Sequence, residues 1–151
     1  ANTDTVVNPV INKAIVKNII KKSAPMVKVT VDGEEFYHEK MFLMTCANGK
    51  YYGGGYCAAP KAIVDDGLLE TLVIRNISRF TFVKLVGDYK KGTHLEKPKF
   101  FKCLKYTQSK EVAIEFEEDA CVCLDGEILY SKKLKINVEP LKLRFLLPAG
   151  E

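Results

Sequence analysis

The sequence predicts a mainly β protein of the α+β type, an antiparallel β-sandwich with one N-terminal helix and one further helix. Many short segments alternate between apolar and polar residues, as strands with one buried face do. Turn dipeptides separate these segments. In only two segments do the apolar residues recur at helical spacing. The length of 151 residues is typical of one domain, and the hydrophobic content of 47% is sufficient for a core.

The first predicted element is a helix over residues 8–22. Its apolar residues recur at helical spacing, Asn8 can cap its N-terminus, and Pro9 suits its first turn. The basic residues in its last turn complement the helix dipole. Because this helix begins almost at the start of the chain, we expect the chain to be a piece of a longer protein.

A β-hairpin is predicted after this helix. Residues 27–31 alternate between valine and polar residues, Asp32-Gly33 supplies the positive φ of a tight turn, and residues 36–48 form the returning strand. The remaining strands are expected at residues 69–76, 99–107, 111–117, 120–124, 127–130, 133–138 and 142–147.

The second helix is predicted over residues 78–89, SRFTFVKLVGDY. Its apolar residues at helical spacing indicate one face that packs on the sheet. We expect this face to consist of Phe80, Val83, Leu85 and Val86.

The composition narrows the cellular setting and the partners. No run of about 18 apolar residues occurs, and the N-terminal ten residues lack the order of a signal peptide. The five cysteines form no recognisable framework, so free thiols in a reducing compartment are expected. The net charge of +4 is small and the lysines are spread along the chain, which argues against a nucleic-acid partner. A cytoplasmic protein is therefore expected.

The tripeptide Asp-Gly-Glu occurs twice, each time after an alternating apolar run. At residues 32–34, turn chemistry explains it fully, since no nucleophile or base stands nearby. The second copy, Asp125-Gly126-Glu127, places two carboxylates on a short apolar hairpin. Such carboxylates can accept a proton from a hydroxyl or help to hold a magnesium–nucleotide complex. The local sequence leaves both an ordinary turn and a catalytic site open, and the turn is the more frequent case.

Two further segments are candidates for ligand binding. Residues 48–56 contain three consecutive glycines, which mark either a bulge or the close approach of another backbone or a ligand. This segment matches neither the P-loop nor the dinucleotide-binding pattern. The turn Asp65-Asp66-Gly67 is structurally ordinary, although adjacent acids and turn carbonyls also bind magnesium or calcium.

In their order, these segments resemble a known family. The order of four motifs resembles that in the C-terminal lobe of bacterial diacylglycerol kinase-like lipid kinases, whose wider family includes the sphingosine kinases. The motifs are ANGKYYGGGYCAAPKAIVDDGLLE, KGTHL, DGE and VEPLKLRFLLP. The similarity runs from about Ala24 to Pro148. It implies that residues 1–23 are the helix left from the inter-lobe connection and that residues 24–151 are the C-terminal β-sandwich lobe.

The resemblance also implies an activity. It is the transfer of the γ-phosphoryl group of ATP, the co-substrate, to the hydroxyl of a diacylglycerol-like lipid. Glu127 would accept the hydroxyl proton with Asp125 beside it, and Gly126 and Glu127 would contact the nucleotide. The first Asp-Gly-Glu corresponds to a hairpin turn without a catalytic role. The implied cofactor is Mg²⁺, held by Asp66 and by the backbone carbonyls of Ile63 and Leu68.

One departure from the family limits this expectation. The chain contains no Gly-Gly-Asp-Gly motif, with which the N-terminal lobe of the family binds the nucleotide. One lobe cannot supply the positioning and charge stabilisation that phosphoryl transfer requires, so we expect the chain alone to be inactive. Its expected partners are the missing N-terminal lobe, a lipid substrate and the membrane periphery. The alternative is a stand-alone β-sandwich module that binds a lipid or a protein without catalysis.

Overall fold

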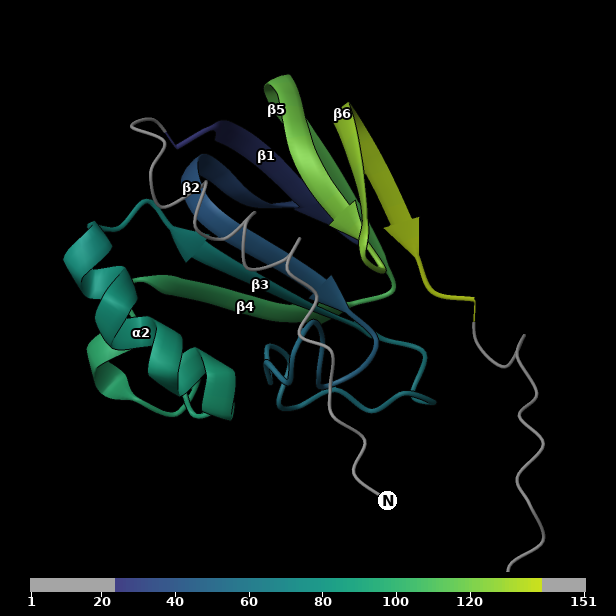
Figure 1. Ribbon diagram of the computed structural model, residues 1–151. Helices are drawn as coiled ribbons and strands as arrows, with labels where there is room; N and C mark the ends of the chain where they lie inside the picture. The colour runs from purple at the N-terminus through teal and green to yellow at the C-terminus, as the bar shows by residue number, and fades with distance from the viewer. Residues whose placement is uncertain (1–23, 140–151) are drawn as a thin grey trace, which may run out of the picture.

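The computed structural model describes residues 24–139. Within this range, six antiparallel strands form one sheet in the order β4-β3-β2-β1-β5-β6 (Figure 1). Their bounds are β1 Met26–Val31, β2 Glu34–Ala47, β3 Leu69–Arg75, β4 Leu104–Ser109, β5 Glu111–Leu124 and β6 Glu127–Asn137. The predicted mainly β, antiparallel fold is confirmed. The predicted helix over residues 8–22 and the predicted strand 142–147 lie outside the described residues.

The sandwich-like shape arises because β5 and β6 bend sharply. Glu115 pairs with Lys133 but Ala120 pairs with Ser131, so β5 carries extra residues opposite β6. Such an irregularity bends a strand and increases its twist. Figure 1 shows both strands folding over at this point, which gives the hairpin a proximal half within the sheet and a distal half beyond the bend.

Five of the predicted strands need correction. Residues 111–117 and 120–124 are one strand, β5, and residues 127–130 and 133–138 are one strand, β6, because the irregular pairing bends the hairpin without ending it. The predicted strand 99–107 is strand only from Leu104 onward. Its beginning forms the 3-10 helix η1, Pro98–Phe100, since proline fixes a helical φ at the first position of that turn.

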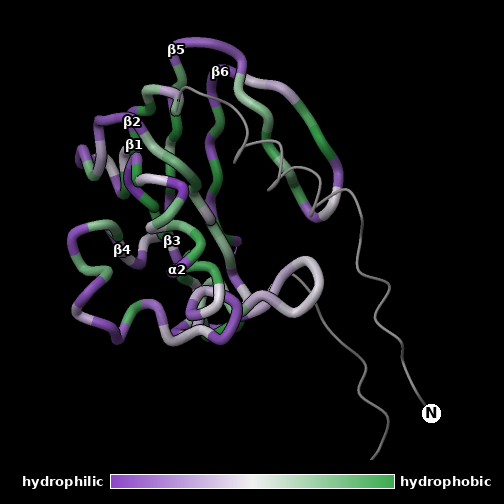
Figure 2. The backbone as a smooth tube through the Cα atoms, turned by 60° about the vertical axis from the view of Figure 1, so that its left-hand side comes forward, coloured by the Kyte–Doolittle hydropathy of each residue, from purple (hydrophilic) through white to green (hydrophobic). Residues whose placement is uncertain are grey.

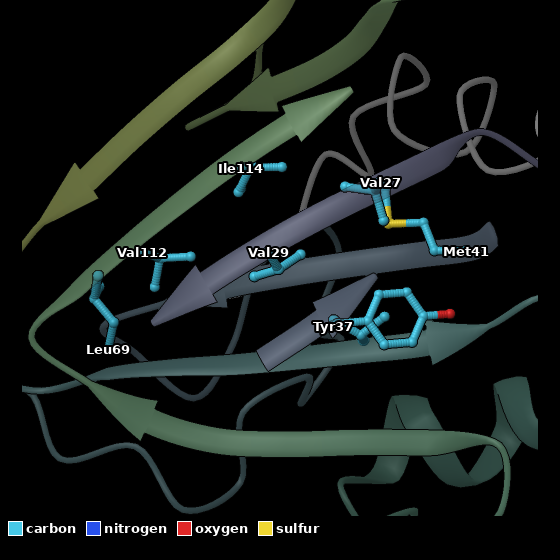
Figure 3. Close-up of a cluster of buried hydrophobic side chains, with 8 residues drawn as sticks. Val27, Val29, Tyr37, Met41, Leu69, Val112 and Ile114 are labelled. Carbon is cyan, nitrogen blue, oxygen red and sulfur yellow. The ribbon is translucent and has the colours of Figure 1, made fainter. Parts of the chain in front are cut away.

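The main core lies on one face of the central strands. Val27 and Val29 on β1 are fully buried, which is the alternation that the sequence predicts. They pack with side chains from β2, β3 and β5, and each fully buried valine contributes about 1.5–3 kcal/mol through apolar burial. The labelled members of this cluster in Figure 3 are Val27, Val29, Tyr37, Met41, Leu69, Val112 and Ile114.

Helix α2, Arg79–Lys91, covers the opposite face of β3 and β4 (Figure 1). The Ser78 side chain accepts a hydrogen bond from the Thr81 N–H at 3.1 Å, and Gly92 ends the helix with φ 77°. This confirms the predicted second helix.

The predicted buried face of this helix is partly wrong. Phe82, Leu85 and Tyr89 are the buried side chains, whereas Phe80 and Val83 are 76% and 67% exposed. Apolar residues occur on both sides of this helix, so the periodicity alone could not choose between them. No helix among the described residues is long and apolar enough to cross a membrane.

Candidate functional site

The second Asp-Gly-Glu forms the tip of the β5–β6 hairpin. Asp125 and Gly126 have φ values of 45° and 98°, as the two central residues of a type I′ turn do, and Glu127 pairs with Leu124 at the first position of β6. Asparagine, aspartate and glycine are the residues that tolerate this conformation. The predicted turn is therefore present, and it fixes both carboxylates at the end of a two-stranded ribbon.

The carboxylates of Asp125 and Glu127 are exposed, and neither side chain makes a hydrogen bond or an ion pair with any of the described residues. Around them the hairpin is apolar: Leu124, Ile128 and Tyr130 are 43%, 45% and 66% exposed. Figure 2 shows the distal half of the hairpin as a hydrophobic ribbon that ends in a hydrophilic tip. Two unpaired acids at the end of an exposed apolar ribbon are available to a ligand.

The first Asp-Gly-Glu has the same backbone but a different environment. Asp32 and Gly33 have φ values of 48° and 88°, again with both central residues in the left-handed region. The Asp32 Oδ1 atom accepts hydrogen bonds from the backbone N–H groups of Lys110 and Glu111, each at 2.9 Å. This carboxylate connects the β1–β2 turn to the β4–β5 turn, so its role is structural, as the sequence predicts.

The glycine-rich segment closes a tight loop beside α2. Tyr52 and Tyr56 exchange backbone hydrogen bonds of 3.0 Å in both directions, and the three glycines between them all have positive φ. Glycine tolerates this conformation without strain, which explains the run. A Cβ atom at Gly55 would meet no atom within 4 Å, so the described chain contains no close approach at this glycine.

Three hydroxyl groups hold this loop in place. The Tyr89 hydroxyl lies 2.8 Å from Thr45 Oγ1 and 3.1 Å from the Tyr52 hydroxyl. Burial raises the pKa of Tyr52 and of Tyr89, so both phenols stay protonated at neutral pH and cannot serve as bases.

The predicted magnesium ligands occupy one exposed turn before β3. The Asp66 N–H donates to the Ile63 carbonyl at 3.4 Å, and Asp66 Oδ1 accepts from the Leu68 N–H at 2.9 Å. The structure therefore brings the three residues together. No hydrogen bond or ion pair among the described residues joins this turn to Asp125 or Glu127.

The donor atoms of this turn fit a hard cation that keeps much of its water. Among the described residues, no three His, Cys, Asp or Glu side chains gather in a way that could hold a metal. An ion at Asp66 would have one carboxylate, backbone carbonyls and water as ligands, which is a set that Mg²⁺ accepts.

A buried carboxylate, Glu70, was missed by the sequence analysis. It is 2% exposed on β3, accepts a hydrogen bond from Gln108 Nε2 at 2.7 Å, and accepts a second from the Tyr106 hydroxyl. Burial raises the pKa of Glu70, and the Asp66 carboxylate adds to this effect. The sequence feature that could have indicated this buried carboxylate is a single charged residue inside the apolar run LLETLVI.

A comparison with protein families identifies the domain. The family model described as "YegS C-terminal NAD kinase beta sandwich-like domain" matches residues 11–147. The chain belongs to this family. The resemblance to the C-terminal lobe of bacterial diacylglycerol kinase-like lipid kinases is thereby confirmed.

Related proteins cover more sequence than this YegS C-terminal domain. The chain is 30% identical over 120 residues to a protein of Shewanella frigidimarina named "Probable lipid kinase YegS-like". The match covers 80% of this chain and 37% of that protein. A protein of Pseudomonas aeruginosa with the same name is 33% identical over 117 residues, covering 77% of this chain and 37% of that protein. The chain thus spans less than half the length of these relatives.

Comparison with solved structures likewise matches this chain to less than half of longer proteins. A crystal structure from Bacillus anthracis, described as "a putative diacylglycerol kinase", superposes with a TM-score of 0.65 at 25% identity, and the match covers 89% of this chain and 44% of that one. A second structure named as such, from the same organism, gives a TM-score of 0.62 at 27% identity over 83% of this chain and 41% of that one. The YegS C-terminal domain accordingly matches a lipid kinase-like domain in both sequence and fold.

The two Asp-Gly turns offer a matched test of the Asp32 hydrogen bonds. Glycine accepts positive φ at both positions, so Asp32→Gly and Asp125→Gly carry the same backbone cost. We expect Asp32→Gly to lower the free energy of unfolding by about 1–3 kcal/mol more than Asp125→Gly, because it removes two hydrogen bonds that contribute about 0.5–1.5 kcal/mol each. Urea unfolding followed by circular dichroism measures both values. Equal losses would show that the two carboxylates contribute alike.

We expect Glu70→Gln to change stability in a pH-dependent way. The folded-state pKa of Glu70 is raised above its ordinary value of 4.5, so its protonated form favours the folded state. This contribution is complete below the pKa of the unfolded chain and is lost as the pH rises through the folded-state pKa. We therefore compare the free energy of unfolding of the variant with that of the unsubstituted chain at each pH. The difference, variant minus unsubstituted chain, should be more positive at pH 7 than at pH 4. A pH-independent difference in urea unfolding would contradict this.

Proposed function

We propose that this chain is the C-terminal lobe of an ATP-dependent lipid kinase in which Glu127 is the general base. The supporting observation is the contrast between the two Asp-Gly-Glu turns. The Asp32 carboxylate accepts two backbone hydrogen bonds, whereas Asp125 and Glu127 have unpaired, exposed carboxylates at the tip of an apolar hairpin. Membership of the YegS C-terminal family supports the same assignment.

The proposed reaction is phosphoryl transfer to an alcohol. The oxygen of the lipid hydroxyl forms a bond to the γ-phosphorus of ATP, the bond between this phosphorus and the β–γ bridging oxygen breaks, and ADP leaves. The hydroxyl proton passes to the Glu127 carboxylate, which requires the two oxygens to come within about 2.6–3.2 Å. The exposure of Glu127 permits this approach.

The other residues of the hairpin take supporting roles. Asp125 adds a second negative charge beside Glu127, and Gly126 presents no side chain, so a nucleotide can come close to the backbone. Leu124, Ile128 and Tyr130 offer an apolar surface to the hydrocarbon part of a lipid, since they remain exposed.

A magnesium ion would be held by Asp66 and by the carbonyls of Ile63 and Leu68, and it would supply a fixed positive charge. The hydrogen bonds that Asp66 makes within the turn, through its backbone and one of its carboxylate oxygens, support this role because they fix the side chain. The nearby Glu70 carboxylate is kept in place by its hydrogen bonds to Tyr106 and Gln108.

The alternative is a β-sandwich module that binds a lipid or a protein without catalysis. The exposed apolar hairpin would suit such a module equally well. The two functions differ in what the Glu127 carboxylate must do, since only catalysis needs a group that takes up a proton.

The test is Glu127→Gln in the complete, two-lobed kinase. Glutamine keeps the size of the side chain but cannot take up the proton, so we expect the kcat for phosphate transfer from ATP to diacylglycerol to fall by about 10²–10⁴. Glu34→Gln is the matched control, because Glu34 is exposed and occupies the same place in the first Asp-Gly-Glu. It should retain full activity. A Glu127→Gln enzyme with a tenth or more of the original kcat would exclude Glu127 as the base.

We expect the 151-residue chain alone to transfer no phosphate from ATP to diacylglycerol. It offers one side of a site that has to position both the nucleotide and the alcohol. A radiolabelled ATP assay with the purified chain is sufficient. Turnover that disappears on Glu127→Gln would show that this lobe is active by itself.

A further inference from the structure

The outward face of α2 carries large apolar side chains that contact no core. Phe80 is 76% exposed, the highest value for any large apolar side chain among the described residues, and Val83 is 67% exposed. At 3.6 residues per turn, these two residues lie opposite the buried Phe82, Leu85 and Tyr89. Lys84, Gly87 and Lys91 fall on the same side as Phe80. We define the outer face of α2 as Phe80, Val83, Lys84, Gly87 and Lys91.

The helix and the segment after it hold the positive charge of the protein. Residues 79–102 contain seven basic and two acidic residues, a net charge of +5, whereas the whole chain has a net charge of +4. The remainder of the chain is therefore slightly acidic. Since surface potential depends on local charge, this part of the molecule attracts anions more strongly than the total charge suggests.

The acidic residues do not neutralise the positive charge at the outer face of α2. Asp88 is engaged on the flank of the helix, where it accepts from Lys97 at 2.6 Å and from Lys99 at 3.3 Å. These contacts hold the segment after α2 beside the helix. Lys84 and Lys91 make no ion pair with the described residues, and Lys84 Nζ lies 5.4 Å from the centroid of the Phe80 ring.

Gly87 leaves the middle of the outer face without a side chain. Glycine inside a helix is less favourable than alanine, because it loses more backbone freedom on folding. A Cβ atom at Gly87 would meet no atom within 4 Å, so packing within the described chain does not require glycine here. Its small size leaves the middle of the outer face flat.

We propose that the outer face of α2 docks on an anionic lipid surface. Phe80 and Val83 enter the interfacial region, while Lys84, Lys91 and the neighbouring lysines lie at the level of the phosphate groups, as in interfacial amphipathic helices. The net charge of +5 over residues 79–102 is complementary to such a surface. The inference rests on the proposed function in one respect: docking would bring the lobe to the membrane that contains its acceptor.

Vesicle binding by the 151-residue chain tests this directly. Sedimentation with phosphatidylglycerol vesicles should show binding that weakens as salt is added, and phosphatidylcholine vesicles should bind far less. Lys84→Glu with Lys91→Glu should lower the affinity for phosphatidylglycerol vesicles at least about 20-fold. Phe80→Ser with Val83→Ser should lower it at least about tenfold.

Each double variant has a matched control. Lys50→Glu with Lys132→Glu makes the same change in net charge at exposed lysines outside this face, and Tyr51→Ser removes an aromatic side chain that is 68% exposed. Both controls should keep the affinity within about twofold, and circular dichroism confirms that every variant is folded.

Three outcomes would overturn the proposal: no binding to phosphatidylglycerol vesicles, equal losses in controls and α2 variants, or a dimer that Phe80→Ser dissociates. The last would assign the face to a second copy of the chain. Vesicle binding needs neither ATP nor a second lobe, so its failure is distinct from a failure of the Glu127 assay.

Discussion

The fold depends on β3 being buried on both faces. Side chains from Leu69 to Ile74 are all inaccessible, so the strand needs a packed layer on each side. Leu69 and Val73 enter the cluster formed with β1, β2 and β5, while Leu72 and Ile74 pack under α2. This requirement determines which side of α2 faces inward, and it leaves Phe80 and Val83 on the opposite side. It also explains Glu70, since a carboxylate on such a strand must be hydrogen-bonded or protonated.

Two identical tripeptides acquire different roles because their neighbours differ. The local rule, Asp-Gly at positive φ, is obeyed in both turns. Pairing of β1 with β5 brings the first turn against the β4–β5 connection, where its carboxylate accepts two N–H groups. The second turn lies beyond the bend of β5 and β6, and neither of its carboxylates makes a hydrogen bond or an ion pair with a described residue. Tertiary pairing, and not the tripeptide, decides which carboxylate remains available.

The sequence predicts well what local rules determine. The Asp-Gly turns, the alternation along β1, the existence of α2 and the apolar character of the second hairpin were all predicted from it. The failures arise where non-local packing decides. A bulge joins two predicted strands in β5, the inward side of α2 depends on β3, and the role of Glu70 depends on Tyr106 and Gln108 from another strand. A glutamate in an apolar run indicates a buried carboxylate. Its hydrogen-bond partners could not be predicted, because they lie more than 30 residues away in the chain.

The β5–β6 hairpin tip and the outer face of α2 are both exposed and apolar, but they differ in the charge that surrounds them, and the roles proposed for them follow this difference. The hairpin tip, residues 120–130, has Asp125 and Glu127 as its only charged residues. An apolar surface with acids can accept a proton and can face a metal–nucleotide complex, whereas its negative charge does not favour docking on the phosphate groups of an anionic membrane. On the outer face of α2, Lys84 and Lys91 take the place of acids and form no ion pair among the described residues, which favours the proposed docking on an anionic membrane over contact with the reacting hydroxyl. Under the two proposals, proton uptake and membrane docking would therefore take place on separate elements of the domain.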